Sequence, residues 1–356
     1  MHVTSVSAEG NPKNLQLHGL AECNTAEEIA LAMGISPEKL RFLTLNSPAS
    51  TITHYTRFKI SKKTGEERSI AAPRPNLKSA QRWILDNILE KLEVHSAAHG
   101  FCKKRSTVTN AKPHVGADIL VKIDLQDFFQ SISYKRVKGL FRGLGYSETA
   151  ANIFGLICTA FEIKEIEKEG QINYTASGDR HLPQGSPASP AISNLICRHL
   201  DSRIAIAVKN LGFCYTRYAD DLTFSGCGEA PRRISNLMRE IKLIIAAEGF
   251  SINRHKTKIM GRAVQQEVTG IVVNTKLNIS KKTLKAFRAT LYQIEQEGLS
   301  GKKWGNSTNL IAAIAGFANY VSMVDPSKGA ELQLRVDRIK QKYAAKDFQN
   351  PYDIEF

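Results

Sequence analysis

Residues 215–225, YTRYADDLTFS, set strand-forming residues on both sides of two adjacent aspartates. Almost no room is left for a loop, so the stretch predicts a tight β-hairpin with Asp220 and Asp221 at its tip. Two carboxylates held side by side repel each other, and a hard divalent cation such as Mg²⁺ would relieve that repulsion. A solvated Asp-Asp turn is the alternative, and these eleven residues alone do not separate the two.

The bulk composition indicates a large chain with a polyanionic partner. The sequence has 356 residues, 42% of them hydrophobic, which is enough for two or three domains. Its formal net charge of +15 points to nucleic acid or an acidic membrane surface. No apolar run reaches the length of a membrane span and residues 1–20 lack a signal pattern, so nucleic acid is the expected partner. The six cysteines form no Cys-x-x-Cys pair, which favours reduced thiols in a cytoplasmic protein.

The first quarter of the chain reads as an arm, short helices and a hairpin. Residues 1–50 begin as a polar arm, up to about residue 24, and continue as short helices. Residues 55–71 alternate like two strands around a charged turn. This pattern predicts a projecting hairpin that carries Lys59 and Arg68.

The middle of the chain alternates helices and strands. An amphipathic helix is expected over residues 76–94, and a buried strand over residues 119–125, ILVKIDL, which carries Asp124 near its end. Residues 162–180 are polar and read as a surface insertion. A single long helix is expected from Ser189 to about residue 208.

The last part of the chain has a different character. From residue 281 onward, three helical patterns follow one another without strands between them. We therefore expect a helical module at the C-terminal side. The sequence shows no internal repeat and no long low-complexity tract.

Asp124 supplies a third carboxylate to the pair in the hairpin. An acid at the end of a strand and an acid at the tip of a hairpin can meet in one sheet. Three carboxylates placed in this way would hold two divalent ions for in-line phosphoryl transfer. The sequence lacks a Gly-x-x-x-x-Gly-Lys-Ser/Thr phosphate-binding loop, so it offers no other route to that chemistry.

Three motifs, in this order, resemble the reverse transcriptases. They are IDLQDFF at residues 123–129, LPQGSP at 182–187 and YADD at 218–221. Two further elements, NAKPH at 110–114 and VTG at 268–270, are similar to the Asn-Ala-x-x-His and Val-Thr-Gly hallmarks of bacterial retron reverse transcriptases. The resemblance covers roughly residues 51–324.

The resemblance implies an α+β right-hand polymerase fold. Its palm would be a small antiparallel sheet backed by helices, and its thumb would be helical. We expect an N-terminal arm and short helices over residues 1–50, fingers over 51–118, a palm over 119–275 with a fingers portion at about 140–185, and a thumb and C-terminal region over 276–356.

The resemblance also implies catalytic roles. Asp124, Asp220 and Asp221 would be the catalytic residues and the ligands of two Mg²⁺ ions, with Asp127 outside the set. The residues expected to bind the incoming nucleotide are Arg68, Lys59, Phe129, Gln184, Gly185 and Lys256. In this set Phe129 would be the steric gate against a ribose 2′-hydroxyl, and Lys256, in competition with Lys258, would donate a proton to pyrophosphate.

A second set of residues is expected at the RNA or the primer. Its members are Asn110, His114, Val268, Thr269, Gly270, Lys281, Lys285 and Arg288. Plain alternatives stay open for several assignments. Phe129 could belong to the core, Lys59 could solvate its hairpin, the basic residues from 281 onward could form a solvated helix face, and Asn110 and His114 could make structural contacts.

The function implied is RNA-directed DNA synthesis by a retron enzyme on its own structured non-coding RNA. Priming from a guanosine 2′-hydroxyl would give a branched RNA–DNA molecule, multicopy single-stranded DNA (msDNA), within an anti-phage defence system. The expected partners are that RNA and its cDNA, dNTPs, a separate effector or toxin protein and a host RNase H, with no membrane. The alternatives are a group II intron-like or abortive-infection reverse transcriptase, and a non-catalytic RNA-binding scaffold.

Overall fold

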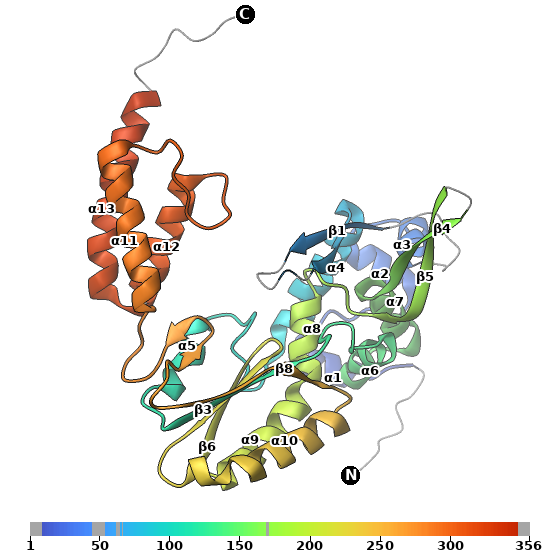
Figure 1. Ribbon diagram of the computed structural model, residues 1–356. Helices are drawn as coiled ribbons and strands as arrows, with labels where there is room; N and C mark the ends of the chain where they lie inside the picture. The colour runs from blue at the N-terminus through green and yellow to red at the C-terminus, as the bar shows by residue number, and fades with distance from the viewer. Residues whose placement is uncertain (1–8, 45–53, 62–64, 66, 169–170, 348–356) are drawn as a thin grey trace, which may run out of the picture. The chain divides into compact units, whose positions relative to one another are not determined.

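The computed structural model describes residues 9–44, 54–61, 65, 67–168 and 171–347 (Figure 1). The chain forms two compact units that are interleaved in the sequence. The first unit takes its residues from 1–103, 122–222 and 232–258, and the second from 104–121, 223–231 and 259–356. Neither unit is therefore a simple N-terminal or C-terminal half of the chain.

A four-stranded sheet carries the acidic motifs. Its order is β6-β7-β3-β8, and its strands are β3 (Ile119–Leu125), β6 (Phe213–Tyr218), β7 (Asp221–Gly226) and β8 (Ile252–Gly261). Strands β6 and β7 form the predicted hairpin, with Ala219 and Asp220 as its two-residue turn. Helix α9 (Arg198–Asn210) packs along β6, and α10 (Ile234–Ala247), which follows the short turn η3 (Ala230–Arg233), packs on α9 (Figure 1). The predicted α+β fold with a small antiparallel sheet backed by helices is confirmed.

The rest of the first unit is mainly helical. Its other helices are α1 (Pro12–Leu17), α2 (Ala26–Met33), α3 (Pro37–Thr44), α4 (Pro75–Asn87) with the turn η1 (Leu89–Lys91), α6 (Tyr134–Leu144), α7 (Glu148–Cys158) and α8 (Ser189–Ile196). Helix α2 begins at a reciprocal capping box formed by Thr25 and Glu28. Between α6 and α7, the buried rings of Phe141, Tyr146 and Phe154 pack with centroids 5.0 to 6.2 Å apart.

Two separate hairpins complete the first unit. The predicted hairpin is β1 (Tyr55–Ser61) paired antiparallel with β2 (Glu67–Pro73). Residues 62–64 and 66 of its charged turn lie outside the described residues. The other hairpin is β4 (Ala160–Lys168) paired antiparallel with β5 (Gln171–His181).

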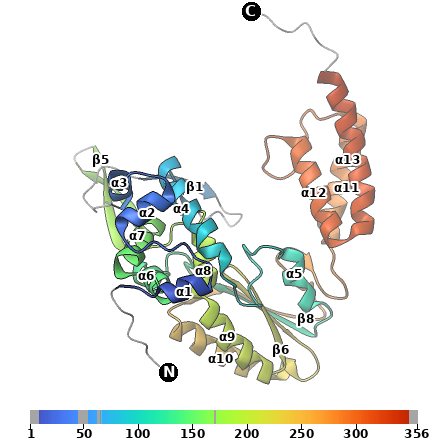
Figure 2. The ribbon, with the colours of Figure 1, turned by 180° about the vertical axis from the view of Figure 1, so that it is seen from behind.

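The second unit is built around a three-helix bundle. Its helices are α11 (Lys281–Glu297), α12 (Leu310–Val324) and α13 (Pro326–Asp347), which lie side by side in Figures 1 and 2. The unit also contains α5 (Thr107–Ala111), the turn η2 (Lys112–His114) and a short hairpin of β9 (Glu267–Val268) and β10 (Ile271–Val272). Phe287, Trp304 and Phe317 form its aromatic centre, with ring centroids 4.6 to 4.8 Å apart. The predicted C-terminal helical module is confirmed.

Two expectations about single elements are wrong, and a third stretch is more regular than the sequence indicates. The polar arm contains helix α1 from residue 12, because Asn11 caps it and Leu15 is buried. The stretch 162–180, expected as a polar surface insertion, forms most of the β4–β5 hairpin, whose strands the sequence did not predict. The single helix expected over 189–208 is two helices, because the backbone opens at Cys197, where ψ is −1°.

None of the described helices combines the length and the apolar character needed to cross a bilayer. None of the six cysteines, all of which are among the described residues, forms a disulfide, and Cys23, Cys158 and Cys197 are buried.

Candidate active site

The sheet brings the three predicted catalytic aspartates onto neighbouring strands. Asp124 is the second-to-last residue of β3, Asp220 lies in the β6–β7 turn, and Asp221 is the first residue of β7. The amide of Leu125 donates a hydrogen bond of 2.9 Å to the carbonyl of Asp220. Because this bond ties the end of β3 to the tip of the hairpin, residues far apart in the sequence meet in one place.

A lysine from the neighbouring strand binds Asp124. The ammonium of Lys256, on β8, donates to both carboxylate oxygens of Asp124, at 3.1 and 3.0 Å. The Asp124 side chain is 9% exposed and the Lys256 side chain 46% exposed, so the cation approaches the acid from the solvent side. Of the two lysines that the sequence offers for this role, Lys256 is therefore the one that reaches the acids.

The three acids interact electrostatically. Burial, and then repulsion from Asp221 and Asp124, raises the pKa of Asp220 to about 6. Burial also raises the pKa of Asp221, although Lys122 and Lys256 oppose the shift. Burial disfavours the charge on Lys256, but the bond to Asp124 and the attraction of all three acids prevail and raise its pKa. The two lysines, Lys122 and Lys256, therefore do not fully offset the repulsion among the three aspartates.

The donor set fits a hard divalent cation. Carboxylate oxygens are the ligands that Mg²⁺ prefers, and the mutual repulsion of the acids would fall when a cation binds. The ammonium of Lys256 already lies where positive charge is needed. Within the described residues, however, no three His, Cys, Asp or Glu side chains converge closely enough to hold a metal. Asp124, Asp220 and Asp221 thus lie on neighbouring segments, but their carboxylates do not form a complete set of metal ligands in this conformation.

The 182–187 turn lies against the β1–β2 hairpin. The carbonyl of Gln184 accepts a hydrogen bond of 2.7 Å from the amide of Ala71, on β2. Gly185 has a φ of 121°, and a Cβ at this position would lie 2.8 Å from the carbonyl oxygen of Ala71 and 3.1 Å from Cγ2 of Ile70. The close approach therefore requires glycine. The side-chain oxygen of Gln184 is buried and has no hydrogen-bond partner, which leaves an acceptor for a ligand.

The register of the β1–β2 hairpin separates two predicted phosphate-binding residues. Arg68 pairs across from Ile60, and Lys59 pairs across from Ser69. Side chains alternate between the faces of a strand, so Arg68 shares a face with Ile70, which approaches Gly185, while Lys59 lies on the other face. Lys59 forms an exposed ion pair of 2.8 Å with Glu67. Only Arg68 of the two is thus on the face that approaches the 182–187 turn.

Phe129 is half-buried and Phe128 fully so. The ring of Phe128 stacks on Phe250 at 5.7 Å, and the ring of Phe129 lies 5.4 Å from that of Phe128. Phe128 therefore takes the core position. The partial exposure of Phe129 leaves it available to a ligand, as the steric-gate prediction requires.

The two elements similar to retron hallmarks contact each other in the second unit. The side-chain amide of Asn110, at the end of α5, donates to the Thr269 hydroxyl at 3.4 Å, and that hydroxyl donates to the carbonyl of Thr107 at 3.2 Å. His114 lies 2.7 Å from the Ser225 hydroxyl. Because Asn110 and His114 are buried, these contacts favour the structural alternative for the two residues.

The Val-Thr-Gly element forms a tight turn. Thr269 and Gly270 link β9 to β10 with φ values of 46° and 84°, the pattern of a two-residue turn with both central residues left-handed. Val268 is buried in the core of the second unit.

The basic residues on α11 differ from one another. Lys281 and Lys285 are exposed, whereas Arg288 is half-buried and lies 3.5 Å from Glu331. Lys281 and Lys285 are free to meet a polyanion from the solvent side. Contact with RNA remains a prediction for all eight members of this set.

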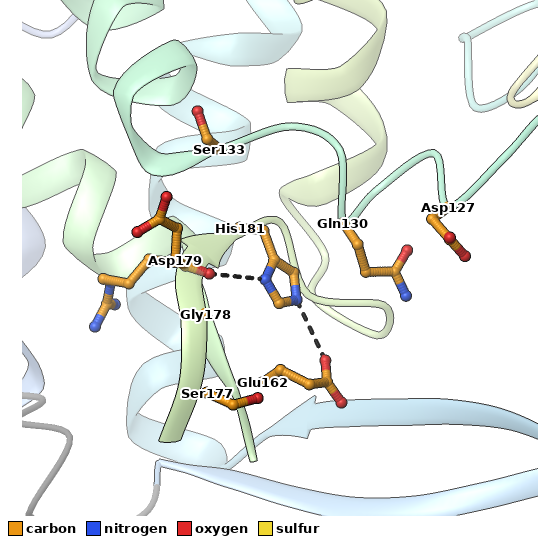
Figure 3. A pocket seen from close by; sticks show the side chains of 9 residues that line it. Asp127, Gln130, Ser133, Glu162, Ser177, Gly178, Asp179 and His181 are labelled. Carbon is orange, nitrogen blue, oxygen red and sulfur yellow. Dashed lines mark hydrogen bonds and ion pairs between the residues drawn. The ribbon is translucent and has the colours of Figure 1, made fainter. Parts of the chain in front are cut away.

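A polar cavity of about 570 Å³ lies in the first unit beside the loop that follows β3 (Figure 3). His181 lies between the carbonyl of Asp179 and the carboxylate of Glu162, at 3.2 and 3.4 Å, and Asp127 and Gln130 line the cavity from the loop (Figure 3). The lining does not include the predicted catalytic or nucleotide-binding residues. Asp127 thus lines a cavity whose lining does not include Asp124, Asp220 or Asp221.

Lys122 is a charged residue of the site that the motifs do not mark. It stands two residues before Asp124 on β3, so the two side chains share a face, and it lowers the pKa of Asp221 against the effect of burial. The signal was present in the sequence as one lysine inside an apolar strand, ILVKIDL.

Comparison with known proteins agrees with this geometry. Residues 60–286 match the family described as reverse transcriptase (RNA-dependent DNA polymerase). The chain is 38% identical to the retron Mx162 reverse transcriptase of Myxococcus xanthus, over 92% of this chain and 70% of that protein. It is 33% identical to the retron Ec86 reverse transcriptase of Escherichia coli, over 94% of this chain and 95% of that protein.

Among solved structures, telomerase from Candida tropicalis aligns with a TM-score of 0.47 at 11% identity, over 84% of this chain and 55% of that chain. Telomerase from Candida albicans aligns with a TM-score of 0.45 at 13% identity, over 80% and 57%. The chain thus spans rather more than half the length of these telomerase chains. On the sequence matches, the chain belongs to the reverse transcriptases and, among them, to the retron reverse transcriptases, and it is an RNA-directed DNA polymerase.

Proposed function

We propose that this polymerase copies part of its own structured non-coding RNA, beginning at the 2′-hydroxyl of a guanosine in that RNA. The product would be a branched RNA–DNA molecule, msDNA, and its biological setting an anti-phage defence system with a separate effector protein. Kinship with retron enzymes supports this reading, since 33 to 38% of the residues match theirs over most of the chain. Removal of the copied RNA would fall to a host RNase H.

The observation that carries the catalytic part is the junction of β3 with the β6–β7 turn. The bond from Leu125 to Asp220 and the two bonds from Lys256 to Asp124 gather carboxylates and a cation at one edge of the sheet. We propose Asp124, Asp220 and Asp221 as the ligands of two Mg²⁺ ions. When bound, the ions would activate the attacking hydroxyl and stabilise charge on the leaving pyrophosphate.

The protein's own side chains would position the reactants. Arg68 would bind the triphosphate of the incoming dNTP, since a guanidinium forks onto phosphate oxygens and Arg68 lies on the face that approaches Gly185. The unpartnered oxygen of Gln184 would accept a hydrogen bond from the nucleotide. Phe129 would occupy the space of a 2′-hydroxyl and so favour deoxyribose.

Lys256 would hold a proton near the leaving group. It is protonated beside Asp124, and its half-exposed ammonium points toward the solvent side of the acids. Donation of that proton to pyrophosphate would neutralise charge as the bond to the α-phosphorus breaks.

The parts of the fold would divide the remaining work. We propose fingers over residues 51–118 with a portion at about 140–185, a palm over 119–275 and a thumb over 276–356, preceded by the N-terminal region 1–50. Lys281, Lys285 and Arg288 on α11 would contact the template–primer backbone. Asn110, His114, Val268, Thr269 and Gly270 would maintain the shape of the RNA-facing part of the second unit rather than touch bases.

A product analysis tests the proposal. The purified chain with its cognate RNA, dNTPs and Mg²⁺ should yield DNA that migrates with RNA under denaturing conditions and is released by a debranching enzyme specific for 2′,5′ bonds. DNA that forms only from an added 3′-hydroxyl primer, and never becomes joined to the RNA, would rule out self-priming and leave a conventional reverse transcriptase. Sequencing of the RNA that copurifies with the chain would identify the template.

A further inference from the structure

A fully buried ion pair lies directly beneath the β6–β7 turn. Arg217, on β6, and Asp201, on α9, have no exposed side-chain surface. The guanidinium donates from Nε to one carboxylate oxygen at 2.8 Å and from Nη2 to the other at 2.7 Å. The hydroxyl of Tyr215 donates to the same carboxylate at 2.8 Å. Asp201 is therefore fully engaged and fixes the guanidinium plane.

The remaining nitrogen of Arg217 reaches the turn itself. Nη1 donates to the carbonyl of Ala219 at 3.1 Å and to the side-chain oxygen of Asn194, on α8, at 2.9 Å. Ala219 immediately precedes Asp220 and has a φ of 57°, in the left-handed region that an alanine rarely adopts. The guanidinium thus holds the peptide that joins Ala219 to Asp220, next to the left-handed residue of the turn.

The same network fixes the other side of the turn. The side-chain amide of Asn194 donates to the carbonyl of Gly100 at 2.8 Å. A Cβ at Gly100 would lie 2.8 Å from the amide nitrogen of Ala219, so the loop of residues 97–100 packs directly on the β6–β7 turn. The backbone of Arg217 joins this loop at both edges, since its amide donates to the carbonyl of Ala97 and its carbonyl accepts from the amide of His99, each at 2.7 Å. The left-handed turn at Ala219 is therefore held both by the Arg217 guanidinium and by the packing of residues 97–100 against it.

We propose that Arg217 is a positioning residue for catalysis, because its guanidinium, oriented by Asp201 and Asn194, holds the Ala219 carbonyl and thereby the direction of Asp220 and Asp221. This inference rests on the proposed catalytic role of those two aspartates. Stability alone does not account for the arrangement, because apolar residues commonly replace a buried ion pair without loss of stability. A lysine could not replace the arginine, because an ammonium lacks the planar fork that reaches three acceptor groups on different elements.

Two kinds of variant separate positioning from stability. Arg217→Lys keeps a positive charge against Asp201 but loses the fork. The double variant Arg217→Met, Asp201→Leu removes both charges and leaves no buried charge unpaired. The control is Arg335→Met, Glu295→Leu, because Arg335 on α13 and Glu295 on α11 form a pair of the same bidentate geometry, at 2.8 and 2.7 Å. This pair is partly exposed and is not part of the network around Arg217.

The measurements are single-nucleotide incorporation on a primed template, thermal unfolding, and hydrogen–deuterium exchange of the amides of residues 97–101 and 218–222 in the full chain. Arg217→Lys should lower kcat at least tenfold while KM for the dNTP changes less than threefold, because the aspartates move but the nucleotide contacts do not. Exchange in the two segments should rise at least tenfold, with α10 unchanged. The double variant should show the same loss of kcat at a melting temperature close to the original, and the control pair should leave kcat within twofold.

The proposal is overturned if Arg217→Lys, or the folded double variant, keeps the original kcat, or if exchange rises equally in all elements. Should the double variant fail to fold, Arg217→Lys alone decides. Asp220→Asn is measured alongside. If Asp220→Asn remains active, the proposed catalytic site is wrong, whereas an inactive Asp220→Asn beside a fully active Arg217→Lys refutes the positioning role alone.

Discussion

Lys256 is the cation that binds Asp124 directly, and its proposed role as a proton donor can be tested by substitution. Its ammonium donates to both carboxylate oxygens of Asp124. The hydrogen bond to Asp124 and the attraction of Asp124, Asp220 and Asp221 raise the pKa of Lys256 despite its burial. Lys258, two residues further along β8, is exposed and the described contacts do not link it to the acids. The two lysines therefore form a natural pair for comparison, of equal chemistry but different position.

Replacement of Lys256 by methionine should lower kcat by about 10²-fold, because a positioned proton donor contributes a factor of that order. Lys258→Met should leave kcat within about threefold of the original. Pre-steady-state incorporation of one nucleotide measures both variants. Equal losses in the two variants would show that general positive charge on β8, rather than a proton donor at Asp124, is what matters.

At the scale of the element, the register of the β1–β2 hairpin decides which cation serves the nucleotide. Arg68 shares a face with Ile70, which approaches Gly185, and Lys59 is on the opposite face with Glu67. An exposed ion pair such as Lys59–Glu67 contributes little to stability. The hairpin thus presents one cation to the 182–187 turn and directs the other away.

Arg68→Ala should raise KM for the dNTP about tenfold, because a hydrogen bond to a charged group contributes roughly 1.5 to 3 kcal/mol. Lys59→Ala should change KM less than twofold. Steady-state kinetics with varied dNTP concentration distinguishes them. A larger effect at Lys59 would mean that the hairpin turns its other face to the nucleotide.

A second element-scale prediction concerns the contact between α12 and α13. A Cβ at Gly329, on α13, would overlap the backbone and hydroxyl of Ser322 on α12, whereas a Cβ at Gly316, on α12, meets open space. Gly329→Ala should destabilise the second unit by roughly 1 to 3 kcal/mol through overpacking. Gly316→Ala should stabilise it by up to about 1 kcal/mol, because alanine favours a helix. Denaturant unfolding measures both, and a neutral Gly329→Ala would refute the close contact.

The sequence predicted those elements whose signal is local. The Asp220–Asp221 hairpin, the strand that carries Asp124 and the C-terminal helices follow from alternation, periodicity and turn length. The β4–β5 hairpin was missed, because charged residues such as Glu162 and Glu165 hide the alternation of a hairpin that stands apart from the sheet. The break at Cys197 was missed because no glycine or proline marks it.

The candidate site follows the same rule. Motif order predicted that Asp124, Asp220, Asp221 and Lys256 belong to one site, and the structure brings them together. Spacing does not reveal a buried partner on another element. The pair Arg217–Asp201 joins a strand to a helix, and the sequence spacing does not show that the two residues meet. The face of Lys59 likewise depends on the register of the β1–β2 pairing, which the sequence alone leaves open.

At the scale of the whole molecule, the surplus of positive charge governs binding of nucleic acid. The net charge of +15 is expected to make affinity fall steeply with salt, since each phosphate contact releases counterions. Each of the two compact units holds one set of candidate residues, the catalytic set in the first and the RNA or primer set in the second. Substitutions on α11 that remove contacts with the nucleic-acid backbone should therefore weaken binding without changing the chemistry at the aspartates.

Lys281→Ala with Lys285→Ala should reduce the slope of log affinity against log salt by about one per lost phosphate contact. The matched control is Arg239→Ala, an exposed cation on α10, which should leave the slope unchanged. Fluorescence anisotropy with a primed RNA template at several salt concentrations measures the slopes. Unchanged slopes in the double variant would mean that these lysines only solvate the helix.

RNA-directed DNA synthesis by this chain is proposed to depend on Asp124, Asp220 and Asp221. Asp127 provides the matched control, since it lies three residues from Asp124, is exposed, and has a φ of 46° that asparagine tolerates. The decisive measurement is incorporation of one dNTP on a primed RNA template by Asp124→Asn, Asp220→Asn and Asp127→Asn. We predict losses of roughly 10³-fold or more for the first two and less than about threefold for the third. DNA synthesis at the original rate by Asp124→Asn or Asp220→Asn would contradict the proposed catalytic role of these aspartates.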